Sequence, residues 1–319
     1  VPPLLSQQRE MFDTHKHPFH KHSKVQAFLC STKAGEDVGR ICAIHNRNHI
    51  EFHDDGRGFF GFLEAVQDED VFRALIKAAS EWLTERGCTN ITGPTDFSTN
   101  EECALFLEGE PGPPVLMMPY NPPYYNRLLE RVGFSKAKDL LAYLMTSDYG
   151  IPERLKRVVS MLSKRREASV RPVDMGELDR EVSLMFDIYN SAWEKNWGFV
   201  PMTREEFEYS AKDFSRIADP NLVLFLLVKG KPVGFSLALP DYNLAFRHMN
   251  GRLLPFGFLK FLWYKRYIER IRVLAMGVMK DYRGLGLDSI MYLETFRRGM
   301  KAGYTEAELS WVLEDNVEM

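Results

Sequence analysis

Hydrophobic and polar positions in the first third of the chain predict four strands and one helix. The strands are short apolar runs bounded by turn residues, at 25–30, 40–46, 59–66 and 88–92. Between the last two, the apolar residues from Phe72 to Leu83 recur with the period of a helix. Gly87 follows this segment and suits a C-terminal cap.

The second half of the chain repeats this order of elements. Its strand-like runs lie at 222–228, 232–239, 272–278 and 306–313. The helix between the last two carries apolar residues from Ile290 onward and ends at Gly303. Because residues 85–89 and 301–305 each follow a strand and then a helix, we expect an internal duplication with a period of roughly 200 residues.

The 319 residues are enough for two hydrophobic cores of ~150 residues each. A short helix over 125–132 and a strand over 140–145 complete the first half in this scheme. A basic amphipathic helix over 151–167 begins the second half. We therefore predict two α/β domains with mixed sheets, at 1–148 and 149–319.

Composition narrows the class of protein. A net charge of -3 argues against a nucleic-acid-binding protein, which usually has a basic face. No pair of cysteines has the C-x-x-C spacing, so neither a zinc ribbon nor a redox pair is indicated, and scattered cysteines suit the cytoplasm. We predict no metal site, because no ligand partner at a recognisable spacing accompanies the histidines at 15, 17, 20 and 22.

Residues 276–287 are the most informative stretch for chemistry. They place Arg283, Gly284 and Gly286 between an apolar strand and a helix. Small residues let main-chain N–H groups approach a pyrophosphate, and a helix N-terminus favours an anion. The stretch resembles the acyl-CoA-binding signature of the GNAT superfamily of acyltransferases, in which an Arg/Gln-x-x-Gly-x-Gly/Ala loop joins a strand to a helix.

The resemblance implies tandem GNAT-like folds and a co-substrate that is acetyl-CoA or a longer acyl-CoA. The residues that it places at the cofactor are Gly277, Val278, Arg283, Gly284, Gly286 and Asn316. Arg283 would orient the loop or reach a phosphate. Asp288 departs from the pattern, because a carboxylate there repels phosphate by on the order of a few kcal/mol. If Asp288 instead caps the helix, it occupies N–H groups that a phosphate needs.

The first half carries another part of this pattern. Residues 120–134 resemble the family's last motif, a short helix that often supplies a tyrosine as general acid, here Tyr124 or Tyr125. The acidic segment 67–70 stands where the glycine loop belongs, so we expect this half to be degenerate for cofactor binding. Nearly the whole chain is also similar to a tandem-domain GNAT group of the YghO type, through residues 1–5, 58–62, 120–125, 196–199 and 250–255.

N-acyl transfer needs a base for the amine, a polarised thioester carbonyl and a proton for the leaving thiolate. We expect the carbonyl to bind a main-chain N–H near Gly277 or Val278. Asp241 follows a strand end, and Glu308 alternates with Ser310 on one face of its strand, although each carboxylate alone is more simply explained as solvated or structural. The candidate catalytic residues are Asp241, Glu308 and Tyr125, with Glu314 as a further base.

Residues 253–267 give a hint about the acyl acceptor, because six aromatic side chains lie there among three basic ones. This composition suits peripheral membrane contact or a lid over a lipid-like substrate. The simpler alternative, which we favour, is an amphipathic helix buried against the core. Three functions stay open: acyl transfer to a small amine, transfer of a longer acyl group to an amino-lipid such as a sphingoid base, and a catalytically inactive ligand- or partner-binding protein. We favour an enzyme.

Overall fold

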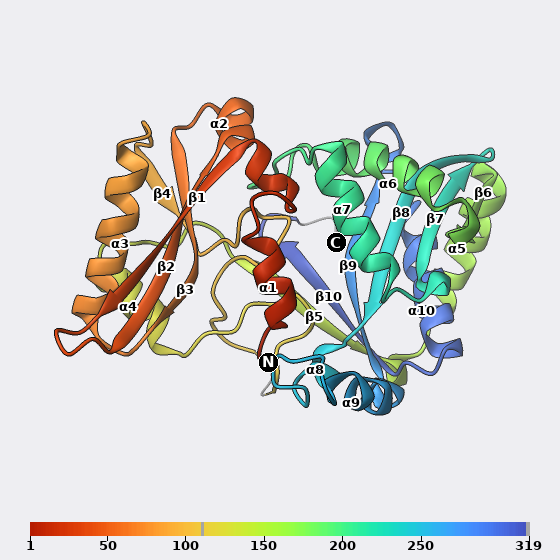
Figure 1. The fold of residues 1–319 in the computed structure, drawn as a ribbon. Helices are drawn as coiled ribbons and strands as arrows, with labels where there is room; N and C mark the ends of the chain where they lie inside the picture. The colour runs from red at the N-terminus through yellow and green to blue at the C-terminus, as the bar shows by residue number, and fades with distance from the viewer. Residues whose placement is uncertain (110–111, 317–319) are drawn as a thin grey trace. The chain divides into compact units, whose positions relative to one another are not determined.

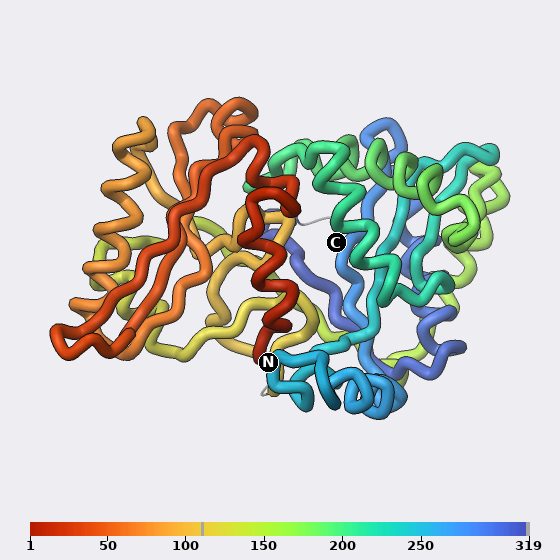
Figure 2. The backbone as a smooth tube through the Cα atoms, in the orientation of Figure 1, coloured from red at the N-terminus to blue at the C-terminus, as the bar shows by residue number. Residues whose placement is uncertain are grey.

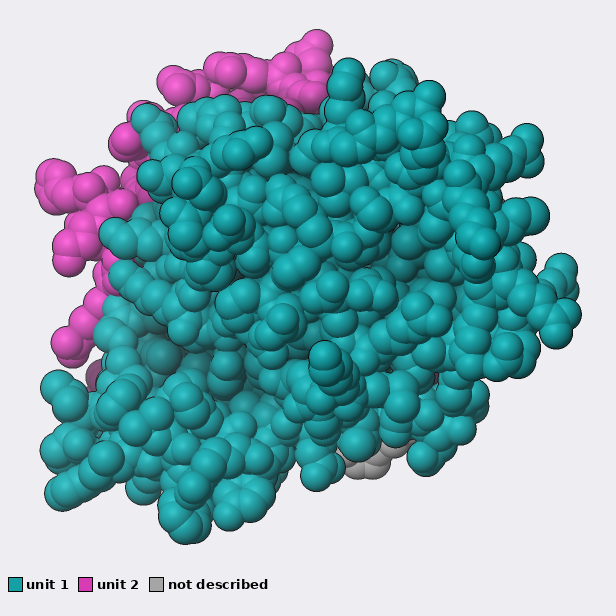
Figure 3. Space-filling model, turned by 90° about the vertical axis from the view of Figure 1, so that its right-hand side faces the viewer, with its two compact units in different colours: residues 1–8, 140–197, 202–319 teal, residues 9–139, 198–201 magenta. Residues whose placement is uncertain are grey.

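The computed structural model describes residues 1–109 and 112–316, and the chain divides into two compact units. The N-terminal unit comprises residues 9–139 and 198–201, and the C-terminal unit comprises residues 1–8, 140–197 and the chain from 202 onward. The two units are coloured separately in Figure 3. Each has its own sheet and its own hydrophobic core.

The N-terminal unit is built on a four-stranded sheet of order β1-β2-β3-β4 (Figure 1). Strands β1, β2 and β3 are antiparallel neighbours, and β4 runs parallel to β3 after the crossover helix α3. The elements are β1 (Ser23–Ser31), β2 (Asp37–Asn46), α2 (Arg47–His53), β3 (Arg57–Ala65), α3 (Glu69–Thr84), β4 (Asn90–Thr92) and α4 (Tyr124–Arg131). Helix α1 (Leu5–Met11) precedes them and crosses the boundary between the units.

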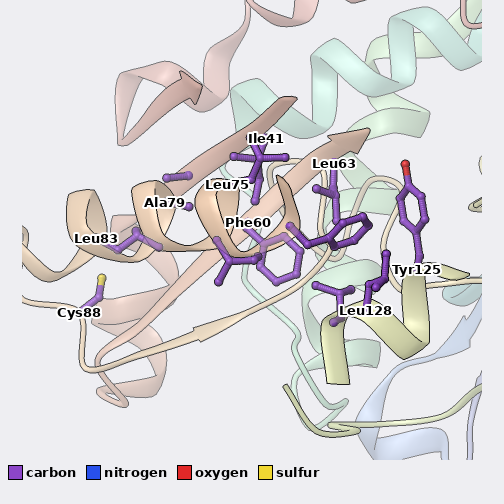
Figure 4. Close-up of a cluster of buried hydrophobic side chains, with 13 residues drawn as sticks. Ile41, Phe60, Leu63, Leu75, Ala79, Leu83, Cys88, Tyr125 and Leu128 are labelled. Carbon is purple, nitrogen blue, oxygen red and sulfur yellow. The ribbon is translucent and has the colours of Figure 1, made fainter. Parts of the chain in front are cut away.

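The core of this unit lies between α3 and the sheet. The helical spacing of Phe72, Leu75, Ala79 and Leu83 places all four side chains on one face of α3, where each is almost fully buried. Figure 4 shows Leu75, Ala79 and Leu83 beside Phe60 of β3. The helix and the four strands that we predicted over residues 25–92 are confirmed.

The C-terminal unit is built on a six-stranded sheet of order β5-β10-β9-β8-β7-β6. Its strands are β5 (Leu140–Thr146), β6 (Ala168–Pro172), β7 (Val223–Val228), β8 (Lys231–Pro240), β9 (Arg270–Val278) and β10 (Glu306–Leu313). Its helices are α5 (Glu153–Arg166), α6 (Leu178–Trp193), α7 (Arg204–Ser215), α8 (Asn243–Phe246), α9 (Gly257–Tyr264) and α10 (Asp288–Lys301). Helices α5 and α10 pack together over one face, and α6 packs on β8 and β9 with α7 beside it.

The repeated order of elements is visible in the topology of the two sheets. In one unit β2 and β3 are antiparallel, and α3 then leads to β4, which is parallel to β3. In the other, β8 and β9 are antiparallel, and α10 then leads to β10, which is parallel to β9. Gly87 and Gly303 end the two crossover helices in the same way, with φ of 83° and 94°.

Strand β5 pairs differently from our expectation. We assigned the strand over 140–145 to the end of the first half, but β5 is hydrogen-bonded to β10, from Leu140 opposite Leu313 to Thr146 opposite Glu306. The apolar pattern identifies a strand without identifying its neighbour, because strand partners are chosen by long-range packing. Helices α2 and α7 and strand β6 were not predicted.

Asp96 in the N-terminal unit gives a pH-dependent prediction. Its Oδ1 accepts a hydrogen bond from the N–H of Phe62 at 2.7 Å, and burial raises the pKa of this carboxyl from 3.8 to about 6. Between these pKa values the folded unit binds more protons than the unfolded chain, so Asp96 increasingly destabilises the fold as the pH rises. We expect Asp96→Asn to stabilise the unit by about 1–2 kcal/mol at pH 7.5, and this gain to shrink steadily toward pH 4.

Thermal denaturation at the two ends of this pH range tests the prediction. Asp68→Asn is the matched control, because asparagine caps a helix about as well as aspartate, so little change in stability is expected there. If Asp96→Asn stabilised the unit equally at pH 4 and pH 7.5, folding would not raise the pKa of the Asp96 carboxyl.

Candidate functional site

Strands β9 and β10 are neighbours in the C-terminal sheet, and they separate along their length. Strand β10 pairs in parallel with β9 only from Arg270 opposite Glu306 to Val273 opposite Leu309. Over the rest of the described chain no strand pairs with this edge of β9 between Leu274 and Val278, whereas its other edge stays paired with β8. The result is a length of strand edge with main-chain groups available to an extended ligand.

The direction of the N–H groups on this edge follows from one hydrogen bond. Met279, one residue beyond the end of β9, donates its N–H to the carbonyl of Val233 in β8 at 2.8 Å. Because successive residues in a strand point to opposite sides, Gly277 also faces β8. Val278 and Met276 therefore present their N–H groups to the unpaired edge. Of the two residues that we predicted near a thioester carbonyl, Val278 is the one with this orientation.

The loop between β9 and α10 ends in a set of N–H groups. Gly284 and Gly286 adopt φ of 67° and 71°, a conformation that favours glycine. Within residues 1–109 and 112–316, the N–H groups of 284–288 donate no hydrogen bond to a protein acceptor. They lie at the N-terminus of a helix of 14 residues, where main-chain N–H groups favour an anion. A Cβ added to Gly284 meets nothing within 4 Å, so the loop is open at this residue.

Arg283 holds this loop in place. Its Nη2 donates to the carbonyls of Ser191 at 2.9 Å and Ala192 at 2.5 Å, in the last turn of α6, and its Nε donates to the carbonyl of Val278 at 3.4 Å. A cation is favoured at the C-terminal end of a helix dipole. Of the two roles that we considered for Arg283, its contacts support orientation of the loop.

Asp288 does not cap α10. It is the first residue of the helix, Leu287 occupies the N-cap position, and no side chain caps this end. The N–H groups of the loop are therefore left to an incoming anion, which overturns the capping alternative. The charge of Asp288 still acts nearby, because it assists burial in raising the pKa of Tyr292 to about 12.

Gly277 has a packing role that is visible without any ligand. A Cβ at this position would lie 2.5 Å from Cη2 of Trp193 and 2.9 Å from Cβ of Ala192. Trp193 stacks on Tyr189 of the same helix, with ring centroids 4.8 Å apart. The absence of a side chain at Gly277 therefore lets the C-terminal end of α6 lie directly on β9.

Glu308 belongs to a polar group on β9 and β10. Its Oε1 accepts a hydrogen bond from Oγ of Ser310 at 2.8 Å, and Ser310 Oγ accepts one from Nε of Arg272 at 3.0 Å. Arg272 is 1% exposed and lies 5.3 Å from the ring centroid of Trp311, whereas Glu308 is half-buried. The guanidinium and the hydroxyl thus fix the orientation of a carboxylate that solvent still reaches.

Asp241 lies near the start of β9, the end of this strand that also lies beside Glu308. Its N–H donates to the carbonyl of Arg270 at 2.9 Å, and its Oδ1 accepts from the N–H of Asn243 at 3.3 Å. The residue is fully buried, so its contacts support a role in the connection from β8 to α8. Asn316 is exposed in the turn after β10, where its N–H donates to Leu313, and Glu314 is exposed in the same turn.

Among its described residues, the N-terminal unit offers no equivalent loop. Asp68 caps α3 through its side chain, which accepts from the N–H groups of Asp70 and Val71. These are the positions that a phosphate would occupy, and a carboxylate already fills them. The contrast with α10 supports the prediction that this half is degenerate for cofactor binding.

Tyr125 lies inside the core of this unit (Figure 4). Its hydroxyl accepts a hydrogen bond from the N–H of Ala65 at 2.9 Å and donates to Glu64 at 3.3 Å. Burial raises its pKa to about 12. These contacts support a structural role, in which Tyr125 fixes the end of β3.

The histidines near the start of the chain pack against aromatic rings. The imidazoles of His17 and His20 each lie 5.3 Å from the ring of Phe97. Among the residues that the structure describes, no three His, Cys, Asp or Glu side chains are placed to hold a metal ion.

The segment 253–267 is exposed, which corrects the expectation that it is buried. The only buried residue of α9 is Gly257. In the described part of the chain, no helix is both long and apolar enough to cross a membrane. Periodicity showed that the segment is amphipathic but gave no information on which face the fold covers.

Sequence reasoning missed Arg272, and with it the contact between its guanidinium and Ser310. One signal was available, because Arg272 stands between Ile271 and Val273 in a mainly apolar strand. A charge in such a position requires a hydrogen-bonding partner when the strand is buried.

The chain was compared with known proteins. No family model matches it. A bacterial ceramide synthase from Caulobacter vibrioides (strain NA1000 / CB15N) is 37% identical over 330 residues, which cover 100% of this chain and 84% of that protein. Protein YghO from Escherichia coli (strain K12) is 32% identical over 326 residues, covering 100% and 83%. A solved tandem GNAT protein from the clavulanic acid biosynthesis pathway has a TM-score of 0.51 at 11% identity, covering 95% of this chain and 78% of the other, which shows a common fold.

Proposed function

This chain belongs to the GNAT superfamily of N-acyltransferases, in the tandem-domain group that includes YghO, and we propose that it transfers a long acyl group from acyl-CoA to the amine of a sphingoid-type lipid base. The C-terminal unit carries the reaction, and the N-terminal unit is a degenerate copy. All four cysteines are free thiols, which is consistent with action in the cytoplasm.

One observation carries the proposal of an acyl-CoA site: the unpaired edge of β9 leads directly into the N–H groups of 284–288. Those groups bind the pyrophosphate of CoA, and Arg283 keeps the loop in the required conformation. The N–H group of Val278, next to the loop, binds the amide-containing arm, and the N–H group of Met276, which is closer to Glu308, binds the thioester carbonyl. Asn316, in the turn after β10, is proposed to contact the same arm.

Glu308 is the proposed general base. It accepts a proton from the ammonium or amine of the acceptor, directly or through one water molecule. The amine nitrogen forms a bond to the thioester carbon, the carbon–sulfur bond breaks, and the thiolate leaves and is protonated to give free CoA. Ser310 and Arg272 hold the Glu308 carboxylate in one orientation during this step.

The lipid acceptor is favoured over a small amine by two observations. The relative that is 37% identical over the full chain is named as a ceramide synthase, which joins an acyl group to a sphingoid base. The C-terminal unit also exposes a large apolar segment between β8 and β9, at the end of β9 where Glu308 and Asp241 lie. An acceptor that resides in the membrane and carries one amine accounts for the name of this relative and for the exposed apolar segment.

An acyl-transfer assay with matched donors and acceptors tests this function. Acetyl-CoA and palmitoyl-CoA are each offered to sphinganine and to glucosamine, and the amide product is measured by mass spectrometry. We expect amide only with sphinganine, and a preference for palmitoyl-CoA of at least about tenfold, because each buried methylene group contributes about 0.8 kcal/mol.

The other outcomes each select a different function. Acetylation of glucosamine at a comparable rate would favour a small-amine acetyltransferase. No amide from any pair, together with no calorimetric binding of either acyl-CoA, would favour a catalytically inactive ligand- or partner-binding protein.

A further inference from the structure

The segment between β8 and β9 exposes many large apolar side chains. Its six most exposed large apolar side chains are each more than half exposed: Leu254, Phe256, Phe258, Leu259, Trp263 and Tyr267. We call this set the apolar face. Single exposed apolar residues are common on protein surfaces, but a contiguous set of this size marks an interaction site. The segment can be followed through α8 and α9 in Figure 2.

The helix that carries this face is held firmly to the unit by its opposite side. Phe261 stacks on Phe246 of α8 at 5.6 Å, and Tyr264 stacks on His248 at 3.7 Å. A Cβ on Gly257 would lie 1.8 Å from the carbonyl of Arg252, so the start of α9 lies directly against the preceding loop. The orientation of α9 is therefore set by packing, and its apolar face points outward as part of the fold.

The charge of this segment identifies what the face contacts. The whole chain has 44 acidic and 41 basic residues, yet no Asp or Glu occurs between Asp241 and Glu269. The same stretch contains five cations: Arg247, Arg252, Lys260, Lys265 and Arg266. The guanidinium of Arg266 lies 4.5 Å from the ring centroid of Trp263. Aromatic rings combined with uncompensated cations are complementary to the headgroup region of an anionic bilayer.

We propose that the apolar face and its cations form a docking surface for the interface of an anionic lipid bilayer. The aromatic and aliphatic side chains enter the interface, and the cations pair with lipid phosphates. The segment that carries this surface leaves the sheet at Asp241 and rejoins it at Arg270, the first residue of β9. The phosphate-binding loop begins after Val278, at the other end of β9. Its consequence for catalysis rests on the proposed function: a lipid acceptor reaches Glu308 from the membrane while acyl-CoA enters from the opposite end of the strand.

Vesicle flotation with the full chain tests the docking surface directly. We expect the protein to float with vesicles of phosphatidylglycerol much more than with vesicles of phosphatidylcholine, and salt to weaken the binding, because each cation near an anionic surface contributes about fivefold. Phe256→Ser combined with Trp263→Ser removes two side chains that are 68% and 57% exposed. We expect this variant to lose at least about tenfold in partitioning.

The matched control is Tyr149→Ser combined with Met161→Ser, which removes apolar side chains that are 78% and 56% exposed elsewhere on the same unit. It is expected to float like the unmodified protein. Calorimetric binding of palmitoyl-CoA is measured on all three proteins, so a failure of the acyl-CoA site is seen separately from a failure of the surface. The proposal is overturned if the unmodified protein ignores phosphatidylglycerol vesicles, if Phe256→Ser/Trp263→Ser floats normally, or if that variant converts a dimer to a monomer by light scattering while vesicles bind neither form.

Discussion

Gly284→Asp is expected to weaken the binding of acyl-CoA by roughly 100-fold with little loss of stability. Aspartate is one of the few residues that tolerate the φ of 67° found at Gly284, and its Cβ has no atom within 4 Å to displace. The added carboxylate would lie among the N–H groups that we assign to the pyrophosphate. At about 5 Å and an effective dielectric constant of about 20, repulsion between two unit charges is about 3 kcal/mol. Isothermal titration calorimetry with palmitoyl-CoA measures the change.

Gly303→Asp is the matched control for this substitution. Gly303 also has a positive φ, 94°, with nothing within 4 Å, and it follows the C-terminal end of the same helix. An acidic residue there costs a few tenths of a kcal/mol through the helix dipole, but it is remote from the proposed phosphate site. Equal loss of affinity in both variants would mean that the loop before α10 does not bind the pyrophosphate.

Glu308→Gln is expected to lower kcat by about 100-fold or more, with a smaller change in KM. Glutamine keeps the shape of Glu308 and an oxygen that accepts from Ser310, but it cannot take a proton from the amine. General-base catalysis of this kind contributes typically 10²–10⁴-fold. Steady-state rates with palmitoyl-CoA and sphinganine measure the effect.

Glu306→Gln supplies the comparison on the same strand and the same face. Glu306 forms an ion pair with Arg270 at 2.7 Å, and both side chains are partly exposed, so its loss costs less than about 1 kcal/mol of stability. We expect its kcat to stay within a factor of a few of the unmodified enzyme. Comparable losses in the two variants would assign both effects to the packing of β10, and Glu308 would not be the base.

Several local features were predictable because their causes lie close together in the sequence. A helix cap, a glycine with positive φ and a period of apolar residues each involve a few consecutive residues. The strand–loop–helix segment from β9 to α10 was predicted on this basis. So was the contrast with α3, where Asp68 fills the N-terminus that Gly284 and Gly286 leave open.

The acid–base group was only partly predictable. Glu308 and Ser310 were recognised as sharing one face of a strand, which depends only on their spacing. Their link to Arg272 depends on the parallel pairing of β9 with β10, between residues 38 positions apart. No local pattern reports such a pairing, so the residue that orients Glu308 was missed.

The sequence by itself determined the mixed α/β class, the repeated order of elements and the place of the glycine loop, because these depend on local periodicity and backbone conformation. Only the tertiary structure decided three features: the pairing of β5 with β10, the separation of β9 from β10, and the exposure of the apolar face on α9. Each depends on which distant segment covers an edge or a face. An apolar stripe has the same sequence pattern whether it is covered by protein or left exposed, so the pattern cannot distinguish a core helix from a surface for docking.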